Sequence, residues 1–146
     1  MLVKIQLIIK KNQRGYIMKH LSRQSILDLA EKSYFYSVDK KDIEKILETM
    51  NQTIVFSIPT HSVIKIGKNE VREMFENLFE EHQEVWHGNF THTVDEESQN
   101  IASTFTVKNT EHDNSIVIKN NCNFFEIENG KFSSITVYMQ GDNTLN

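Results

Sequence analysis

The sequence predicts an α+β fold: three N-terminal helices packed in the concave face of a strongly curved, mainly antiparallel sheet, an arrangement called an α+β cone. Apolar residues first recur with the spacing of amphipathic helices, and from Gln83 onward the periodicity changes to that of strands. Turn-forming residues separate the strand segments, as in a series of hairpins. A sheet that bends around helices encloses a hollow, and we expect any functional site to lie there.

The expected helices cover 22–37, 43–50 and 67–79. Ser22 is a suitable N-cap for the first helix, and a turn is expected at Asp39. Tyr34 shares the apolar stripe of this first helix with Ile26 and Ala30. We therefore expect Tyr34 to face the interior.

The expected strands cover 53–58, 62–66, 83–94, 101–109, 114–127 and 131–140. Pro59 ends the first of them because proline cannot donate to a strand ladder. In the last hairpin, strand alternation places Asn121 and Asn123 on the same face as Phe125 and Ile127. Those two apolar side chains would pack against helices, so this face is taken as the concave one.

The chain of 146 residues is long enough for one domain with its own core, which we assign to residues 22–141. Residues 1–21 are expected to form an N-terminal extension, either weakly ordered or an additional edge strand, and residues 142–146 a C-terminal tail. The apolar segment at the N-terminus is interrupted by Lys4 and Gln6. It therefore predicts neither a signal peptide nor a membrane span.

Composition argues against several classes of partner. The net charge is −4 and the pI about 5.9, and Lys and Arg cluster only in the first 23 residues, so no nucleic acid partner is expected. Cys122 is the only cysteine, which excludes an intrachain disulfide and agrees with a cytoplasmic location. No cluster of histidines and carboxylates shares a predicted face, so we expect no metal and no cofactor.

An ordered set of motifs resembles the SnoaL-like branch of the nuclear-transport-factor-2-like superfamily, over roughly residues 22–141. The motifs are Ala30 and Tyr34 followed by Asp42, Ile58-Pro59, Gly67 with Glu70-Val71, His87, the segment 125–131, and Val137-Tyr138-Met139. The resemblance implies the α+β cone and, commonly, a dimer formed through the outer sheet face. The superfamily contains isomerases, dehydratases, cyclases and members that only bind, so its fold does not choose among them.

The resemblance to ketosteroid isomerase, a distant relative, can be followed residue by residue. Tyr34 and Asp42 reproduce the spacing between that family's hydrogen-bond-donating tyrosine and the aspartate that starts the second helix. The family's carboxylate base falls on Ile58, which cannot accept a proton, and its second oxyanion acid falls on Asn123. Cyclases of the SnoaL type often carry an aspartate where this chain has Gln140. Whether the protein is an enzyme is therefore left open.

Histidine remains as the candidate proton carrier. His87 is the first choice, because the family pattern places a histidine at this strand entrance, and His61 could act from the loop after the first strand. Each could instead be structural or solvated. Strand alternation places His87 and His92 on opposite faces unless a bulge intervenes.

The concave surface is expected to be mainly apolar with a few polar groups, which suits a small apolar or carbonyl-bearing molecule. Tyr34 and Asn123 are its expected polar anchors, with His87 nearby. The other expected ligand contacts are Ile58, His61, Phe75, Phe79, Phe105, Val107, Asn121, Val137 and Met139. The alternative is that these side chains simply fill a core.

The sequence thus favours a small-molecule-binding protein with no assured catalytic activity. One alternative is an isomerase, dehydratase or cyclase in which a histidine moves a proton and Tyr34 with Asn123 stabilises an oxyanion. Another is a protein–protein interaction module. Residues on the outer sheet face suit a partner sheet, so a homodimer is expected through Thr104, Thr106, Thr136 and Tyr138.

Overall fold

The computed structural model describes residues 8–11 and 17–146. Its first long helix is continuous and has three stretches: α1 (Arg23–Asp28), the π-helical η1 (Leu29–Phe35) and α2 (Tyr36–Asp39). The Ser22 hydroxyl caps it by accepting a hydrogen bond from the Ser25 amide at 3.2 Å. The helix continues two residues beyond its predicted end, so Asp39 is its last residue and not part of a turn.

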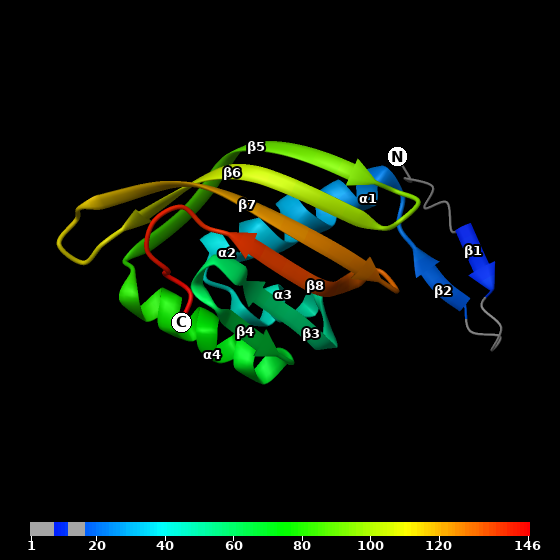
Figure 1. The fold of residues 1–146 in the computed structure, drawn as a ribbon, viewed down its shortest axis with the longest axis horizontal. Helices are drawn as coiled ribbons and strands as arrows, with labels where there is room; N and C mark the ends of the chain where they lie inside the picture. Colours follow the sequence, from blue (N-terminus) through cyan, green and yellow to red (C-terminus); the bar gives the residue numbers. More distant parts are fainter. Residues whose placement is uncertain (1–7, 12–16) are drawn as a thin grey trace.

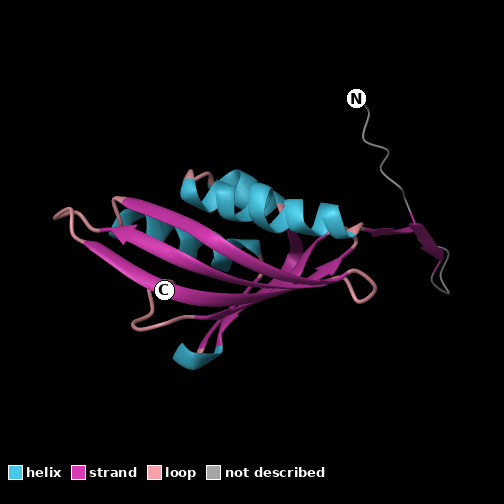
Figure 2. Cartoon of the chain, turned by 90° about the horizontal axis from the view of Figure 1, so that it is seen from above, coloured by secondary structure: helices cyan, strands magenta, loops and turns pink. Residues whose placement is uncertain are grey.

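Two further helices follow. Asp42 caps α3 (Ile43–Glu48) by accepting from the Lys45 amide at 3.1 Å, which gives this aspartate a structural role. The helix α4 (Lys68–Glu81) follows Gly67, which adopts a positive φ of 84° that favours glycine. The first long helix, α3 and α4 correspond to the three helices expected from the sequence. They cover one face of the sheet (Figures 1 and 2).

The main sheet runs in the order β4-β3-β8-β7-β6-β5. Its strands are β3 (Met50–Ile58), β4 (Val63–Ile66), β5 (Glu84–Asp95), β6 (Asn100–Thr110), β7 (Ile116–Glu128) and β8 (Lys131–Tyr138). Neighbours are antiparallel except β3 and β8, which are parallel. The short 3-10 helix η2 (Pro59–His61) connects β3 to β4. The predicted α+β cone, with helices against a curved, mainly antiparallel sheet, is confirmed.

Strand alternation builds the core between sheet and helices. Along β7 the inward positions, from Lys119 to Ile127, are buried, and the residues between them are more exposed. Phe125 of this row packs against Phe132 of β8 and Tyr34 of the first helix, with ring centroids 4.7 and 5.5 Å away. The face chosen as concave from the sequence is therefore the core face.

A bulge in β5 changes the predicted facing of the two histidines. The register with β6 shifts between Gly88 and Thr91, and Asn89 adopts a left-handed φ of 54°. The extra residue shifts the alternation by one position, so the side chains of His87 and His92 are both largely buried, each 11% exposed. The two histidines therefore share the concave face, which the simple alternation did not predict.

The N-terminal part forms a separate small sheet. The strand β1 (Ile8–Lys11) pairs antiparallel with β2 (Ile17–His20), beyond one end of the main sheet (Figures 1 and 2). Lys19 joins the two parts, because its amide donates to Asn129 Oδ1 at 2.9 Å. The predicted extension 1–21 also includes residues 1–7 and 12–16, which lie outside the described residues. In the described ranges, no helix has the length and apolar character that a membrane crossing requires.

Candidate functional site

A small cavity lies between the first helix, α4 and the concave face of the sheet. We call it the cone cavity. It is lined by Tyr34, Phe35, Val38, Phe75, Leu78, His87, Phe105, Asn121, Asn123, Val137 and Leu145. Its volume is about 40 Å³, enough for a few water molecules. Typical small-molecule sites measure roughly 300–1,000 Å³, so the hollow expected from the sequence is almost filled.

His87 lies on the cavity wall and is paired with Asp39. His87 Nδ1 lies 2.6 Å from Asp39 Oδ1, and the His87 backbone amide donates to Asp39 Oδ2 at 3.2 Å. An ionised carboxylate can only accept, so Nδ1 carries the hydrogen. In a neutral ring this leaves the lone pair on Nε2 as the basic site. Phe35 and Phe105 hold the imidazole plane at centroid distances of 5.2 and 5.5 Å.

Polar groups from the first helix and β7 face the same cavity. Asn123 is 3% exposed, and its Oδ1 has no hydrogen-bond partner among the described residues. Asn121 Oδ1 accepts from the Gln140 amide at 3.0 Å. Tyr34 is surrounded by phenylalanine rings, and burial raises the pKa of its hydroxyl well above the usual range. The hydroxyl therefore remains protonated and available as a donor.

The C-terminal segment, residues 141–146, closes the cavity. Leu145 is 9% exposed and contributes to the cavity lining. The segment turns back from β8 toward α4 (Figure 1), where the Asn77 side chain donates to the Asn146 carbonyl at 3.3 Å. At its start the Gly141 carbonyl accepts from His61 Nε2 at 2.9 Å. Between these ends the Asp142 carbonyl accepts from the Lys119 ammonium, so side-chain hydrogen bonds from three elements hold the segment over the cavity.

The structure brings together most of the predicted site residues. Tyr34, Phe75, His87, Phe105, Asn121, Asn123 and Val137 all line the cone cavity. Ile58, Phe79, Val107 and Met139 belong to the core or its margin without lining the cavity, and His61 binds the C-terminal segment. Asp39 and Leu145 were not predicted as site residues. From the sequence, Asp39 was expected in a turn and Leu145 in the C-terminal tail.

The other inward histidine belongs to a structural network. His92 Nε2 donates to Glu31 Oε2 at 2.9 Å, and its Nδ1 lies 2.8 Å from the Ser103 hydroxyl. This order of serine, histidine and carboxylate is the arrangement of a hydrolase triad. Ser103 is 0% exposed and does not line the cone cavity, so no substrate can reach its hydroxyl. The network instead fastens the first helix to β5 and β6.

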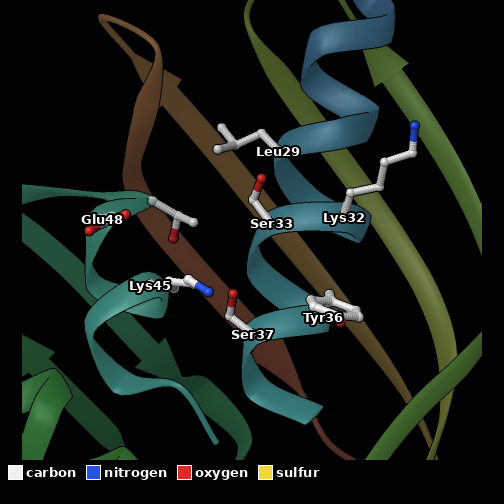
Figure 3. Close-up of a pocket in the computed structure, with 8 residues that line it drawn as sticks. Leu29, Lys32, Ser33, Tyr36, Ser37, Lys45 and Glu48 are labelled. Atoms are coloured by element: carbon white, nitrogen blue, oxygen red, sulfur yellow. The ribbon is translucent and has the colours of Figure 1, made fainter. Parts of the chain in front are cut away.

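A second concavity lies on the outer side of the helices, between the first helix and α3 (Figure 3). It measures about 410 Å³ and is lined by Leu29, Lys32, Ser33, Tyr36, Ser37, Lys45, Glu48 and Thr49. Figure 3 shows Lys45 extending toward the helix that carries Ser33 and Ser37. Lys45 pairs with Asp42 at 3.3 Å, and Lys32 with Asp28 at 2.9 Å. Both lysines of this concavity are thus paired with carboxylates. The concavity is not lined by a histidine, so it has no pair like that of His87 and Asp39.

In the described part of the chain, no group of three or more histidine, cysteine or acidic side chains converges. Ile58 and Gln140, the two positions at which the resemblance would place an acid, both have structural roles here. Ile58 is fully buried in the core. Gln140 is tied to β7 because its Oε1 accepts from the Asn120 amide at 2.9 Å. The candidate proton carrier on the wall of the cone cavity is therefore His87, with Asp39 hydrogen-bonded to it.

Comparison with known proteins agrees with this architecture. Residues 32–135 match the family model of the SnoaL-like domain. The chain belongs to the SnoaL-like domain family. The resemblance noted from the ordered motifs is thereby confirmed. A search of curated proteins finds no match to this SnoaL-like protein.

Solved structures similar to this SnoaL-like protein share its fold at low sequence identity. A candidate polyketide cyclase from Xanthomonas campestris pv. campestris has a TM-score of 0.74 at 13% identity, covering 81% of this chain and 92% of that chain. SalBIII, an epoxide hydrolase/cyclase-like enzyme, has a TM-score of 0.72 at 19% identity, covering 82% and 93%. A candidate aromatic ring hydroxylase from Novosphingobium aromaticivorans has a TM-score of 0.68 at 24% identity, covering 82% and 90%.

Proposed function

We propose that the cone cavity takes up a small, mainly apolar, carbonyl-bearing molecule and that His87 exchanges a proton with it. The observation that carries this proposal is the pair of Asp39 and His87, with 2.6 Å between Oδ1 and Nδ1, because His87 lies on the wall of a cavity that is also lined by the potential donors Tyr34 and Asn123. The class of reaction is that of isomerases, dehydratases and cyclases. The similar fold of SalBIII, an epoxide hydrolase/cyclase-like enzyme with a role in pyran ring formation in salinomycin, supports this choice of reaction class.

The chemistry follows from the donors and acceptors on the wall. His87 Nε2 takes a proton from the carbon next to a carbonyl, and the C–H electron pair moves into the enolate. The Tyr34 hydroxyl or the Asn123 amide donates a hydrogen bond to the enolate oxygen. The proton then returns from Nε2 to carbon. Asp39 holds the ring in place and stabilises the imidazolium that forms between the two steps.

Uptake requires the C-terminal segment to move. The cavity of about 40 Å³ cannot hold an organic molecule while Leu145 lies in its wall. Displacing the segment breaks the hydrogen bonds from His61 to the Gly141 carbonyl, from Lys119 to the Asp142 carbonyl and from Asn77 to the Asn146 carbonyl. Gly141, at a φ of 70° with open space around its Cα, is a suitable hinge.

A deuterium-exchange assay tests the proposed proton transfer. We expect the protein to accelerate deuteration of 2-tetralone beside its carbonyl in D₂O, followed by NMR, and His87→Gln to slow the catalysed exchange about 100-fold, since a positioned base typically contributes about 10²–10⁴. His112→Gln is the matched control, because His112 is exposed at a hairpin and outside the cavity. Equal rates for wild type and His87→Gln would contradict the catalytic role. If 2-tetralone bound without faster deuterium exchange, the protein would bind such molecules but not catalyse the proton transfer.

Homodimerisation through the outer sheet face is a further part of the proposal. This face exposes Trp86, Phe124 and Tyr138 at 41%, 38% and 48%, and such aromatic side chains are enriched at protein interfaces. We expect light scattering to give about twice the chain mass of 17.1 kDa, and Phe124→Glu to give the monomer mass. Tyr36→Glu, on the first helix and therefore on the opposite side of the sheet, is the control that keeps the dimer. A wild-type mass that stays at one chain at all concentrations would exclude this dimer.

A further inference from the structure

Lys119 is a buried cation on the concave face of β7. It is 6% exposed, and its ammonium donates to the Asp142 backbone carbonyl and lies 3.7 Å from the Met139 sulfur, a weak acceptor. Burial lowers the pKa of the Lys119 ammonium, and the carboxylates of Asp142 and Glu111 oppose this shift only in part. Neither lies within the 4 Å of an ion pair with this ammonium, and Glu111 is hydrogen-bonded to His82 instead. A buried charge is costly unless it is paired. Lys119 is therefore an incompletely compensated cation.

Strand register places Lys119 and His87 in one row across the sheet. His87 of β5 lies opposite Val107 of β6, and Val107 lies opposite Lys119 of β7. Neighbouring strands are about 4.8 Å apart, so the two backbones lie about 10 Å apart, with both side chains on the concave face. That separation matches a ligand whose anionic end contacts Lys119 while a carbon a few bonds away reaches His87.

The C-terminal segment separates the surroundings of these two residues. A hollow of about 380 Å³ beside the segment is lined by Lys119 together with Glu111, Val117, Ile118, Gln140, Gly141, Asp142 and Thr144. On its inner side Leu145 closes the cone cavity. Movement of the segment would join the two spaces and remove the Asp142 carbonyl from the Lys119 ammonium at the same time.

We propose that the ligand of the cone carries a carboxylate, and that this carboxylate replaces the Asp142 carbonyl on the Lys119 ammonium when the C-terminal segment moves away. The inference rests on the proposed function, because it names the class of molecule that enters the same cavity. In the closed state the carbonyl dipole serves as a partial substitute for the anion. A carboxylate is the better partner, since hydrogen bonds between two charged groups are shorter and stronger.

A pair of probes of equal shape tests the charge requirement. We expect naphthalene-2-carboxylate to bind the wild type at least about tenfold more tightly than naphthalene-2-carboxamide by calorimetry, a factor that a charge-assisted hydrogen bond can supply. Lys119→Met should abolish this preference and leave the amide affinity within about twofold, because only the charge is lost. The amide signals of residues 141–146 in NMR should shift when the carboxylate is added.

Two control variants distinguish the loss of the Lys119 charge from a general effect on the fold. Lys119→Arg keeps the cation and should keep the preference. Lys108→Met removes a lysine from the outer face of the neighbouring strand β6 and should also keep it. Equal affinities of the two probes for the wild type, or an unchanged preference in Lys119→Met, would overturn the inference and leave the proposed function standing. If neither probe bound, both would be overturned.

Discussion

Replacing Phe35 by alanine is expected to lower the free energy of unfolding by about 3–5 kcal/mol, the usual cost of truncating a buried phenylalanine. Phe35 is 2% exposed and comes from the π-helical stretch. Its ring contacts Phe105 and Phe90 at centroid distances of 4.7 and 4.9 Å, and it also packs against His87. Removing the ring leaves a cavity at the point where helix, sheet and candidate site meet. Urea unfolding followed by circular dichroism measures the change.

The neighbouring residue provides the control for this prediction. Tyr36 is 57% exposed on the same helix, so Tyr36→Ala is expected to change stability little. A loss below about 1 kcal/mol in Phe35→Ala would mean that the surrounding rings close the space. The expectation that Phe35 is essential to this junction of helix and sheet would then be wrong.

Much of the fold was predictable because it follows from local patterns. Apolar residues with helical spacing place α4, and alternation along β7 identifies its inward row from Asn121 to Ile127. Those signals need only the residues within one element. The parallel pairing of β3 with β8 joins residues about 80 positions apart, such as Phe56 and Ile135, and no short-range pattern carries that information.

The candidate site was predictable only in part, for the same physical reason. Tyr34, Asn121 and Asn123 were placed in the cavity by periodicity alone. Asp39 was missed because its contact with His87 spans 48 positions and requires the helix to continue past the expected turn. The shared face of His87 and His92 depends on the bulge at Asn89, a residue type that tolerates a positive φ but does not by itself predict one.

The filling of the cavity also lies beyond sequence periodicity. Leu145 belongs to a segment without regular secondary structure, so neither helical spacing nor alternation assigns it a direction. Its burial results from the turn at Gly141 and from contacts with distant elements, such as that between Asn77 and Asn146. The sequence therefore indicates which groups face the concave side but not whether they enclose free space.

Replacing Asp39 by alanine is expected to lower the free energy of unfolding by about 2–4 kcal/mol, because two donors of His87 lose their charged acceptor. These donors are Nδ1–H at 2.6 Å and the backbone amide at 3.2 Å, and the histidine side chain is only 11% exposed. The carboxylate also fixes the Nδ1–H tautomer, so its loss should let the hydrogen move to Nε2 and remove the basic site from the cavity. Long-range ¹H–¹⁵N spectra of the imidazole distinguish the two tautomers.

The stability and tautomer effects of Asp39→Ala separate a positioning role from a merely structural one. Asp28→Ala removes a carboxylate that pairs with exposed Lys32 at 2.9 Å, so this matched variant should leave stability and the His87 tautomer nearly unchanged. If Asp39 only anchored the helix, Asp39→Ala would be less stable and keep the Nδ1–H tautomer. If it positions the base, the tautomer changes and deuterium exchange into 2-tetralone falls together with it. An unchanged exchange rate in a folded Asp39→Ala variant would exclude the pair as the proton-transfer unit and leave the cone cavity as a binding site alone.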